Sequence, residues 1–345
     1  MACEITFLAV GNADSIVICP DADPAIVVDL PLPRAVTDCL LLRSRLSIGC
    51  ILVTHAHRDH FVPLTKFVSF LEQWHAKGGS VEKVVTGLEV FTDAFEELRT
   101  LNPSSPAYKR LRHALDNLSI LRKGSMLFTD EGRNITPTYN RGKLEITIIH
   151  PETIFFADHR SRFPRRHNER SLVLRISYGD FAAILLADLE GEGISECLDT
   201  CAEEELRANL VKFPHHGAWT KNGSELEKLL RKIDAELAVL SVGSTNTYGH
   251  VVPETFRMLL GLVRDPTARL RSFLCTEVTR TCTHSSAHRA GMGKKGLTSR
   301  LPCAGNIVIS GDETGHLEIT APLPADHAKT IGGLKYAACE GRTDI

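Results

Sequence analysis

Three histidines and an aspartate crowd into one short segment of the chain, LVTHAHRDHFVPL (52–64). Residues two apart on an extended chain point to the same side, so His55 and His57 can share one face. A turn after them allows Asp59 and His60 to face a second point close by. Imidazoles and carboxylates are ligands for Zn, Mn or Fe, and four such groups exceed what one ion takes from a single turn. The segment therefore predicts two adjacent metal ions, against the alternative of a solvated histidine-rich turn.

Two metal ions need further ligands from the ends of other strands. The apolar run FAAILLAD (181–188) closes on Asp188, and an aspartate is rarely buried without a partner. The alternative role of Asp188 is to cap the helix that follows it. The segment LVKFPHHGAW (210–219) runs from a strand into His215 and His216. Either histidine could reach a metal ion, and the alternative is a plain pair of loop histidines.

The hydrophobic pattern places these residues at the ends of predicted strands. β-Branched and apolar runs predict strands at 4–10, 15–20, 25–30, 48–55, 83–89, 144–150, 171–179, 181–188, 209–213, 235–242 and 269–277, and a hairpin at 306–320. Apolar residues at helical spacing predict helices at 63–77, 91–123, 190–208, 224–234 and 253–264. Gly179 and Asp180 predict a tight hairpin between two of the strands. The tail after Pro324 is expected to be loose.

Composition and charge narrow the class of protein. The 345 residues carry a formal net charge of -2 and are 43% hydrophobic, which is ordinary for a globular chain. This balance excludes a strongly basic coat for nucleic acid but leaves room for a local basic groove. No run reaches the ~18 apolar residues of a membrane span, so we expect none. The start, MACEITFLAV, has neither a basic region nor a cleavage site, so we expect no signal peptide and a cytoplasmic location.

The ten cysteines are scattered along the chain. Without an export signal they predict reduced, mostly buried thiols. Cys275, Cys282, His284 and Cys303 could form a small zinc site near the C-terminus. Because these residues include no Cys-x-x-Cys pair, buried free thiols are the favoured interpretation.

The order of the motifs resembles a known fold family. Over about residues 3–262, the chain resembles the metallo-β-lactamase fold in VGNADSIVI, VVDLP, VTHAHRDH, NERSLVLRISYG, ILLADLEGEG, KFPHHGAW and SVGSTNTYGH. Its His-His-Gly and Tyr-Gly-His segments resemble the hydrolase domain of ComEC-type competence DNA-uptake proteins. The resemblance implies an α/β fold, a four-layer αββα sandwich. Residues 1–265 would form the hydrolase domain, and the extension 266–345, with a strand, a basic loop, a hairpin and a tail, would pack on it.

The resemblance also implies metal ligands. It assigns His55 and His57 to one ion, Asp59 and His60 to the other, and Asp188 to a bridging position between them. His215 is the expected remaining ligand, with His216 as the alternative.

Five further residues match positions around the family's metal site. Asp29 matches an early aspartate that supports the histidine turn, since such carboxylates fix ligand tautomers. Asn168 and Ser171 match an Asn-x-x-Ser motif. His250 matches the late Tyr-Gly-His and is expected to contact substrate or transfer a proton, with a structural turn histidine as the alternative. His150 is a further candidate ligand for the first ion.

These residues predict a binuclear hydrolase that holds two divalent ions, Zn or Mn. A water shared by two cations ionises near neutral pH, and the bridging hydroxide can attack phosphorus or carbonyl carbon. The expected catalytic residues are Asp59, Asp188 and His250. Basic loops at 159–170 and 280–300 could flank an anionic substrate, or could be plain solvated loops.

The expected activity is therefore that of a phosphodiesterase or nuclease acting on nucleic acid or a nucleotide, a phosphate-containing substrate. One alternative is an ester or lactone hydrolase with the same metal ions. A second alternative is a non-catalytic regulatory module that binds metal. Metallo-hydrolases of this type often act beside other proteins, so a protein partner encoded nearby is also expected.

Overall fold

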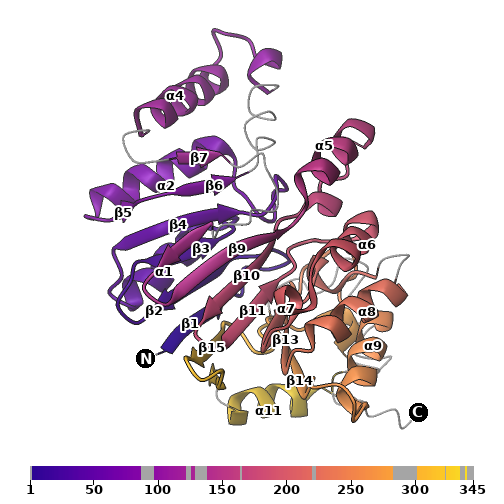
Figure 1. Ribbon diagram of the computed structural model, residues 1–345. Coiled ribbons are helices and arrows are strands. Elements are labelled where there is room, and N and C mark those ends of the chain that lie inside the picture. Colours follow the sequence, from indigo (N-terminus) through magenta and orange to yellow (C-terminus); the bar gives the residue numbers. More distant parts are fainter. Residues whose placement is uncertain are drawn as a thin grey trace.

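The computed structural model describes residues 2–86, 97–121, 126–128, 138–163, 165–219, 223–282, 301–322, 324–334 and 339. Two β-sheets pack face to face, and helices cover both outer faces (Figure 1). This is the four-layer αββα sandwich that the sequence predicts.

The first sheet is mixed. Its strands lie in the order β16 (Leu317–Ala321), β15 (Ile307–Asp312), β1 (Ala2–Phe7), β2 (Ile16–Pro20), β3 (Ala25–Val28), β4 (Ser47–Val53), β6 (Val84–Thr86) and β7 (Met126–Phe128). The short strand β5 (Ser80–Val81) also pairs with β4. From β3 to β7 the strands are parallel, and the remaining neighbours are antiparallel.

The second sheet places four parallel strand ends along one edge. Its strands lie in the order β14 (Ser272–Cys275), β13 (Leu237–Leu240), β12 (Leu210–Lys212), β11 (Phe181–Leu185), β10 (Val173–Tyr178), β9 (Leu144–His150) and β8 (Tyr139–Arg141). Strands β11 to β14 are parallel, so the loops that follow them gather at the same edge. The predicted hairpin at Gly179 and Asp180 is confirmed, because Tyr178 pairs directly with Phe181.

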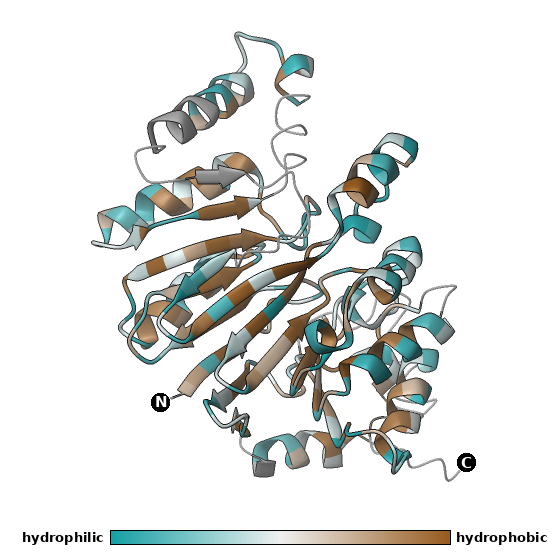
Figure 2. Ribbon diagram, in the orientation of Figure 1, coloured by the Kyte–Doolittle hydropathy of each residue, from teal (hydrophilic) through white to brown (hydrophobic). Residues whose placement is uncertain are grey.

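Side-chain alternation along the strands divides the interior into three apolar layers. In β11, Ala183 and Leu185 face the other sheet, whereas Ala182 and Ile184 face the helices. Figure 2 shows the strands as mostly hydrophobic and the outer helices as mixed.

Helices close both outer faces. On the first sheet lie α1 (Pro33–Leu42) and α2 (Leu64–Ala76), with α4 (Pro106–Leu121) packed on α2. The second sheet is covered by α6 (Gly191–Thr200), α7 (Glu203–Leu206), α8 (Gly223–Ile233) and α9 (Pro253–Arg264). The remaining helices are α5 (Thr153–Arg162), α11 (Pro324–Gly333) and the short turns η1 (Asn168–Arg170), η2 (His215–Gly217) and η3 (Arg280–Cys282). None of the helices described is both long and apolar enough to cross a bilayer.

Several segments differ from the sequence prediction, which included neither α1 nor α5. The expected helix at 190–208 is two helices, because the chain is extended at Cys201, whose thiol donates to the Ile149 carbonyl oxygen at 3.3 Å. The tail after Pro324 is not loose at its start: it forms α11, because Ile331 and Leu334 pack on the apolar layer beneath it. Parts of three predicted elements lie outside the described residues: the strand at 83–89, the helix at 91–123 and the basic loop at 280–300. The residues concerned are 87–96, 122–123 and 283–300, and the last of these ranges contains His284.

Strands beyond residue 265 extend both sheets, since β14 pairs with β13 and β15 pairs with β1. The described chain contains no disulfide, and nine of its ten thiols are buried. Burial raises the pKa of Cys275 and of Cys282, so both thiols stay protonated at neutral pH.

Candidate metal centre

The predicted ligands meet at one edge of the sandwich. The histidine turn follows β4, Asp188 lies three residues after β11, and His215 and His216 follow β12. Three segments far apart in sequence thus supply one cluster of imidazoles and carboxylates.

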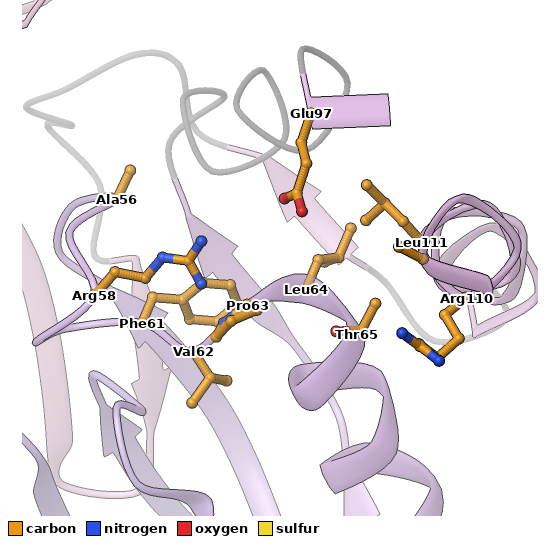
Figure 3. A pocket seen from close by; sticks show the side chains of 11 residues that line it. Ala56, Arg58, Phe61, Val62, Pro63, Leu64, Thr65, Glu97, Arg110 and Leu111 are labelled. Carbon is orange, nitrogen blue, oxygen red and sulfur yellow. The ribbon is translucent and has the colours of Figure 1, made fainter. Parts of the chain in front are cut away.

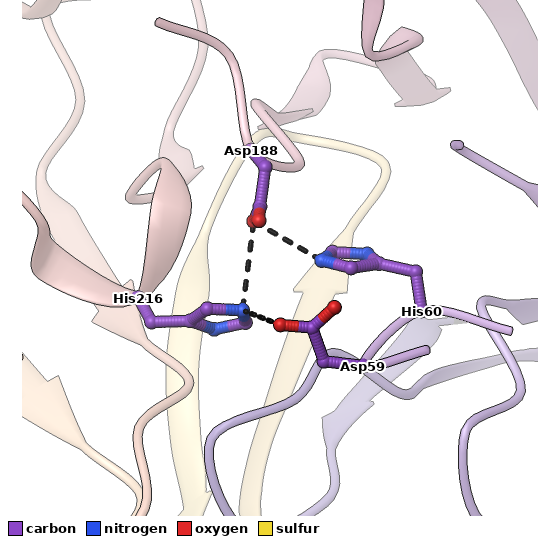
Figure 4. A group of neighbouring side chains, drawn as sticks. All are labelled: Asp59, His60, Asp188 and His216. Atoms are coloured by element: carbon purple, nitrogen blue, oxygen red, sulfur yellow. Dashed lines mark ion pairs between the residues drawn. The ribbon is translucent and has the colours of Figure 1, made fainter. Parts of the chain in front are cut away.

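The first group consists of Asp59, His60, Asp188 and His216, whose ligand atoms all lie within 4.8 Å of one another (Figure 4). His60 Nε2 is 3.1 Å from Asp188 Oδ1. His216 Nε2 is 3.6 Å from the same Oδ1 and 3.6 Å from Asp59 Oδ2. One small ion between these atoms could contact all four side chains.

Three buried atoms that form ion pairs with one another but no hydrogen bond support a metal ion in this group. His60 Nε2, His216 Nε2 and Asp188 Oδ1 are buried, and none has a hydrogen-bond partner in the described part of the chain. Such groups are nearly always paired in folded proteins. The Nδ1 atoms point outward, to Asp29 Oδ2 at 2.6 Å from His60 and to the Ser241 carbonyl oxygen at 2.8 Å from His216. Each imidazole therefore donates from Nδ1, so that Nε2, once it carries no proton, would direct its lone pair inward, which is the form that binds a cation.

The second group lies on the other side of Asp188. His55, His57 and Asp188 also keep their ligand atoms within 4.8 Å of one another. His55 Nε2 is 3.1 Å from His57 Nδ1 and 3.9 Å from Asp188 Oδ2. The His55 Nδ1 atom lies 3.2 Å from Thr54 Oγ1, so this ring is also held from behind. Asp188 presents one oxygen to each group, an arrangement suited to two cations that share a carboxylate.

Opposite charges at short range set the protonation of the cluster. Burial raises the pKa of Asp188, but His60 and His216 lower it more, and the result lies well below the ordinary range. Burial lowers the pKa of His60, but Asp188 and Asp29 raise it more, and the result lies well above 6.5. Burial and the neighbouring His60 leave the pKa of His55 well below 6.5. Without a metal ion, a proton on His60 is what balances the carboxylates.

Metal affinity is expected to fall as the pH is lowered, because an ion in the first group must displace the proton on His60. Below the raised pKa of His60, one displaced proton weakens the apparent affinity about tenfold per pH unit. The metal-free protein should respond in the opposite sense. The stabilisation from protonated His60 is complete below 6.5 and is lost as the pH rises through its raised pKa. Titration with Zn or Mn at pH 6, 7 and 8, beside thermal unfolding in EDTA, measures both slopes. Affinity that does not change with pH would contradict this charge assignment.

Asp29 holds the histidine turn in place. Its Oδ1 accepts the Thr54 backbone N–H at 2.8 Å, and its Oδ2 accepts the Thr54 hydroxyl at 2.8 Å and His60 Nδ1. A third group of close ligand atoms, Asp14, Asp29 and His60, has a different role. Its carboxylates are already used, because Asp14 pairs with Lys212 and Asp29 with Thr54.

Replacing Asp29 by alanine is expected to weaken metal binding by about 10- to 100-fold, because His60 loses the acceptor that fixes its ring. Competition with a chromophoric chelator measures the affinity. Asp38→Ala, which removes an exposed carboxylate of α1 that pairs with Arg34, is the matched control. Equal affinity for the two variants would show that Asp29 does not orient the ligand.

His215 lies beside the cluster, in contact with an acid that the sequence did not reveal. His215 Nδ1 is 2.9 Å from Glu190 Oε2, and its Nε2 is 3.8 Å from Asp188 Oδ2. Burial lowers the pKa of His215, but the hydrogen bond to Glu190 and the charge of Asp188 raise it above 6.5. Asn168 Nδ2 donates to Glu190 Oε1 at 3.2 Å and lies 3.4 Å from His215 Nε2. The signal for Glu190 is its place two residues after Asp188 in ADLEG.

The structure thus separates the two histidines that the sequence left as alternatives. His216 joins Asp59, His60 and Asp188, whereas His215 faces the other oxygen of Asp188. Both histidines have left-handed backbone, with φ of 46° and 51°. Such conformations cost of the order of 1–3 kcal/mol each outside glycine and cluster at functional sites.

Three other predicted residues have different surroundings. The His250 ring centroid is 5.4 Å from that of His215, and burial with the neighbouring His215 and His216 lowers the pKa of His250 to about 4. Ser171 is buried, and its backbone N–H donates to the Asn168 carbonyl oxygen at 3.0 Å, so it braces that loop. His150 is not brought to the cluster: its Nδ1 contacts the Glu196 carboxylate and its Nε2 lies 3.3 Å from the Glu169 carbonyl oxygen.

A cavity of about 780 Å³ opens onto the cluster. The cavity is lined by the ligands Asp59, Asp188 and His216 and by five of their neighbours: Arg58, Asn168, His215, Tyr248 and His250. Its volume is in the range of pockets that take small-molecule ligands. We call it the metal cavity.

Comparison with known proteins gives one local match in sequence. No protein-family model matches the chain. Over 96 residues it is 31% identical to ComE operon protein 3 of Bacillus subtilis (strain 168), a match that spans 28% of this chain and 12% of that protein.

The layers and the ligand positions decide the fold. Two face-to-face sheets lie between helices, and the His-x-His-x-Asp-His turn ends a parallel strand at the edge where Asp188 and His216 meet it. The protein has a metallo-β-lactamase fold.

Several solved structures are similar to this metallo-β-lactamase-fold chain at low identity. A diphosphatase from the PhnP family is 12% identical, with 70% of this chain and 87% of that chain covered and a TM-score of 0.40. The metallo-β-lactamase-fold protein YhfI of Bacillus subtilis is 11% identical, with 75% and 94% covered and a TM-score of 0.44. A long form RNase Z from yeast is 14% identical, with 79% and 40% covered and a TM-score of 0.44.

Proposed function

We propose that this protein is a binuclear metal-dependent hydrolase that cleaves phosphodiesters in nucleic acid or a nucleotide. The observation that carries the proposal is the position of Asp188. Its two oxygens face two separate groups of ligand atoms, and three of the buried atoms in the first group lack any other partner among the described residues.

In this proposal Asp59, His60 and His216 would hold one ion and His55 and His57 the other, and Asp188 belongs to both groups of ligand atoms. Divalent cations bound there would lower the pKa of water to near neutrality and stabilise negative charge on a phosphoryl group. Asp29 and Thr54 keep the rings of His60 and His55 in the orientation that binding needs.

Two histidines beside the ligands are suited to opposite proton roles. His215 is held by Glu190, and the hydrogen bond to Glu190 raises the pKa of His215. This favours the protonated ring, whose Nε2 can donate to a phosphoryl or leaving oxygen. His250 has a pKa of about 4, so it is neutral and can accept a proton or a hydrogen bond. The nucleophile comes from water in this account, so no serine or cysteine is required.

The surroundings of the metal cavity favour an anionic substrate over an apolar ester. Arg58 lines the cavity, and its side chain is exposed. The basic segment 159–170, predicted as a loop, runs instead from the last turn of α5 to η1. It also reaches the site, because the His167 ring centroid lies 5.3 Å from that of His57. Arg165, two residues before His167, is exposed. Positive charge at a cleft concentrates anions there.

Metal analysis and a panel of substrates test this function. Protein purified without chelator is expected to hold about two Zn or Mn per chain, and to hydrolyse bis(4-nitrophenyl) phosphate and single-stranded DNA or RNA. Hydrolysis of 4-nitrophenyl acetate or a lactone, without phosphodiester turnover, would favour the ester reading. Two bound ions with no turnover of either class would favour a regulatory module.

A further inference from the structure

A second cavity, of about 180 Å³, lies on the other side of the histidine turn (Figure 3). The turn and the start of α2 form one wall, with Phe61 and Leu64, and α4 forms the other, with Arg110 and Leu111. Arg58 lines this cavity and the metal cavity as well. We call it the α4 cavity. It belongs to none of the ligand groups described above.

Two arginines of the α4 cavity are exposed and make no ion pair with any described residue. Figure 3 shows Arg58 and Arg110 on opposite sides of the first turn of α2. Many other arginines of this protein have a carboxylate partner; examples are Arg43, Arg141, Arg162, Arg231 and Arg269. Two unmatched cations around one small cavity are available for an anion from outside.

The position of Arg58 links the α4 cavity to the metal cluster. It lies between His57 and Asp59, which the proposed function assigns to different ions. An anion held by Arg58 therefore lies next to whatever the metal cavity holds. A substrate that spans both cavities needs a second anionic group beside the bond that is cleaved. A chain of phosphodiesters has this pattern, with one charge on every unit.

The other side chains that line the α4 cavity suit the base and the sugar of a nucleotide. Phe61, Leu64 and Leu111 are buried apolar side chains that can pack against a base or sugar. The Glu97 carboxylate points toward Leu64 in Figure 3 and can accept a hydrogen bond from a base amino group or a sugar hydroxyl. Its charge also disfavours a phosphate at that end, which leaves the arginines as the place for the phosphate.

We propose that the α4 cavity is a subsite for the nucleotide that flanks the scissile phosphodiester of a single-stranded oligonucleotide, with its phosphate on Arg58 and Arg110. This deepens the proposed function and rests on it. The subsite makes the protein selective for substrates longer than one phosphodiester. A base in a duplex could not enter a cavity of this size without leaving its pair.

Arg110→Ala is the test, because Arg110 lines the α4 cavity and is not among the residues that line the metal cavity. With a ten-unit oligothymidylate, we expect kcat/KM to fall about tenfold. With bis(4-nitrophenyl) phosphate, which has no second phosphate for the subsite to hold, kcat/KM should stay within about twofold. Lys109→Ala removes the same charge from the next residue of α4, outside the cavity, and should leave both values unchanged. Arg58→Ala should lower kcat/KM for both substrates.

Binding without turnover gives a second readout. In EDTA, fluorescence anisotropy of the labelled oligothymidylate should show weaker binding to Arg110→Ala, and its slope of log K against log salt should be smaller by about 0.7. If wild type cleaves the small diester and Arg110→Ala matches Lys109→Ala on the oligonucleotide, the subsite is refuted and the proposed function stands. If wild type cleaves no phosphodiester but Arg110→Ala loses oligonucleotide binding, the proposed function fails and the strand-binding subsite is supported. If Arg110→Ala keeps both the cleavage and the binding of the oligonucleotide at wild-type levels, the subsite proposal is overturned.

Discussion

Asp188→Asn is expected to lower kcat/KM for phosphodiester hydrolysis by roughly three orders of magnitude or more, because it removes the one carboxylate shared by both ligand groups. Asparagine keeps the size of the side chain but not its charge, and Asp188 is only 1% exposed, so no water molecule can substitute for the lost ligand easily. Metal content should fall from about two ions per chain to fewer than one. Elemental analysis and steady-state kinetics measure the two effects together.

Asp180→Asn is the matched control for Asp188→Asn. Asp180 lies in the exposed turn at the other end of β11, and the same chemical change there should leave metal content and activity as they are in wild type. An Asp188→Asn protein that keeps both ions and most of its activity would exclude a bridging role.

Lys212→Met is expected to lower the free energy of unfolding by roughly 3–5 kcal/mol, because it leaves a buried carboxylate without its partner. Lys212 has no exposed surface; it pairs with Asp14 and donates to the Ala187 carbonyl oxygen at 2.8 Å. Asp14 is 1% exposed, and its backbone N–H donates to the Asp59 carbonyl oxygen at 3.1 Å. The pair therefore joins β12 to the loop beneath the histidine turn. Urea unfolding in EDTA measures its contribution apart from any bound metal.

Two further variants separate the buried charge from the loss of side-chain packing. Asp14→Asn combined with Lys212→Met should recover part of the loss, because no charge is left unpaired. Lys143→Met removes a surface lysine paired with Glu313, which is worth about 1 kcal/mol or less. If Lys212→Met were no more damaging than Lys143→Met, or the double variant no better than the single, the buried-charge explanation would be wrong.

The fold was largely predictable because its elements have strong local signals. The strand ending at Val53 is apolar throughout, as a strand between two layers must be, and Gly179 permits the tight hairpin that follows β10. The start of α11 was not predictable from local pattern. It has few apolar residues, and the helix is stabilised by their packing on the apolar layer. The assignment of 1–265 and 266–345 as domain and extension, the cytoplasmic location and a protein partner stay predictions.

The sequence was enough to predict which segments form the candidate site, but not which side-chain atoms in those segments contact one another. Strand ends in parallel sheets meet at one edge, so the histidine turn and Asp188 could be paired from sequence. His215 and His216 could not be told apart, because their ring directions depend on left-handed backbone at both residues. Glu190 was missed for a related reason: an acid just before the first turn of a helix is common, and only the fold shows that it contacts His215.

Crystallography of the metal-loaded protein tests the central claim most directly, through anomalous scattering at the Zn or Mn edge. The account predicts two peaks about 3.5–4 Å apart, one on each side of the Asp188 carboxylate. His216 should bind the ion nearer Asp59, and His55 and His57 the other. A single peak, or peaks that Asp188 does not contact, would contradict it.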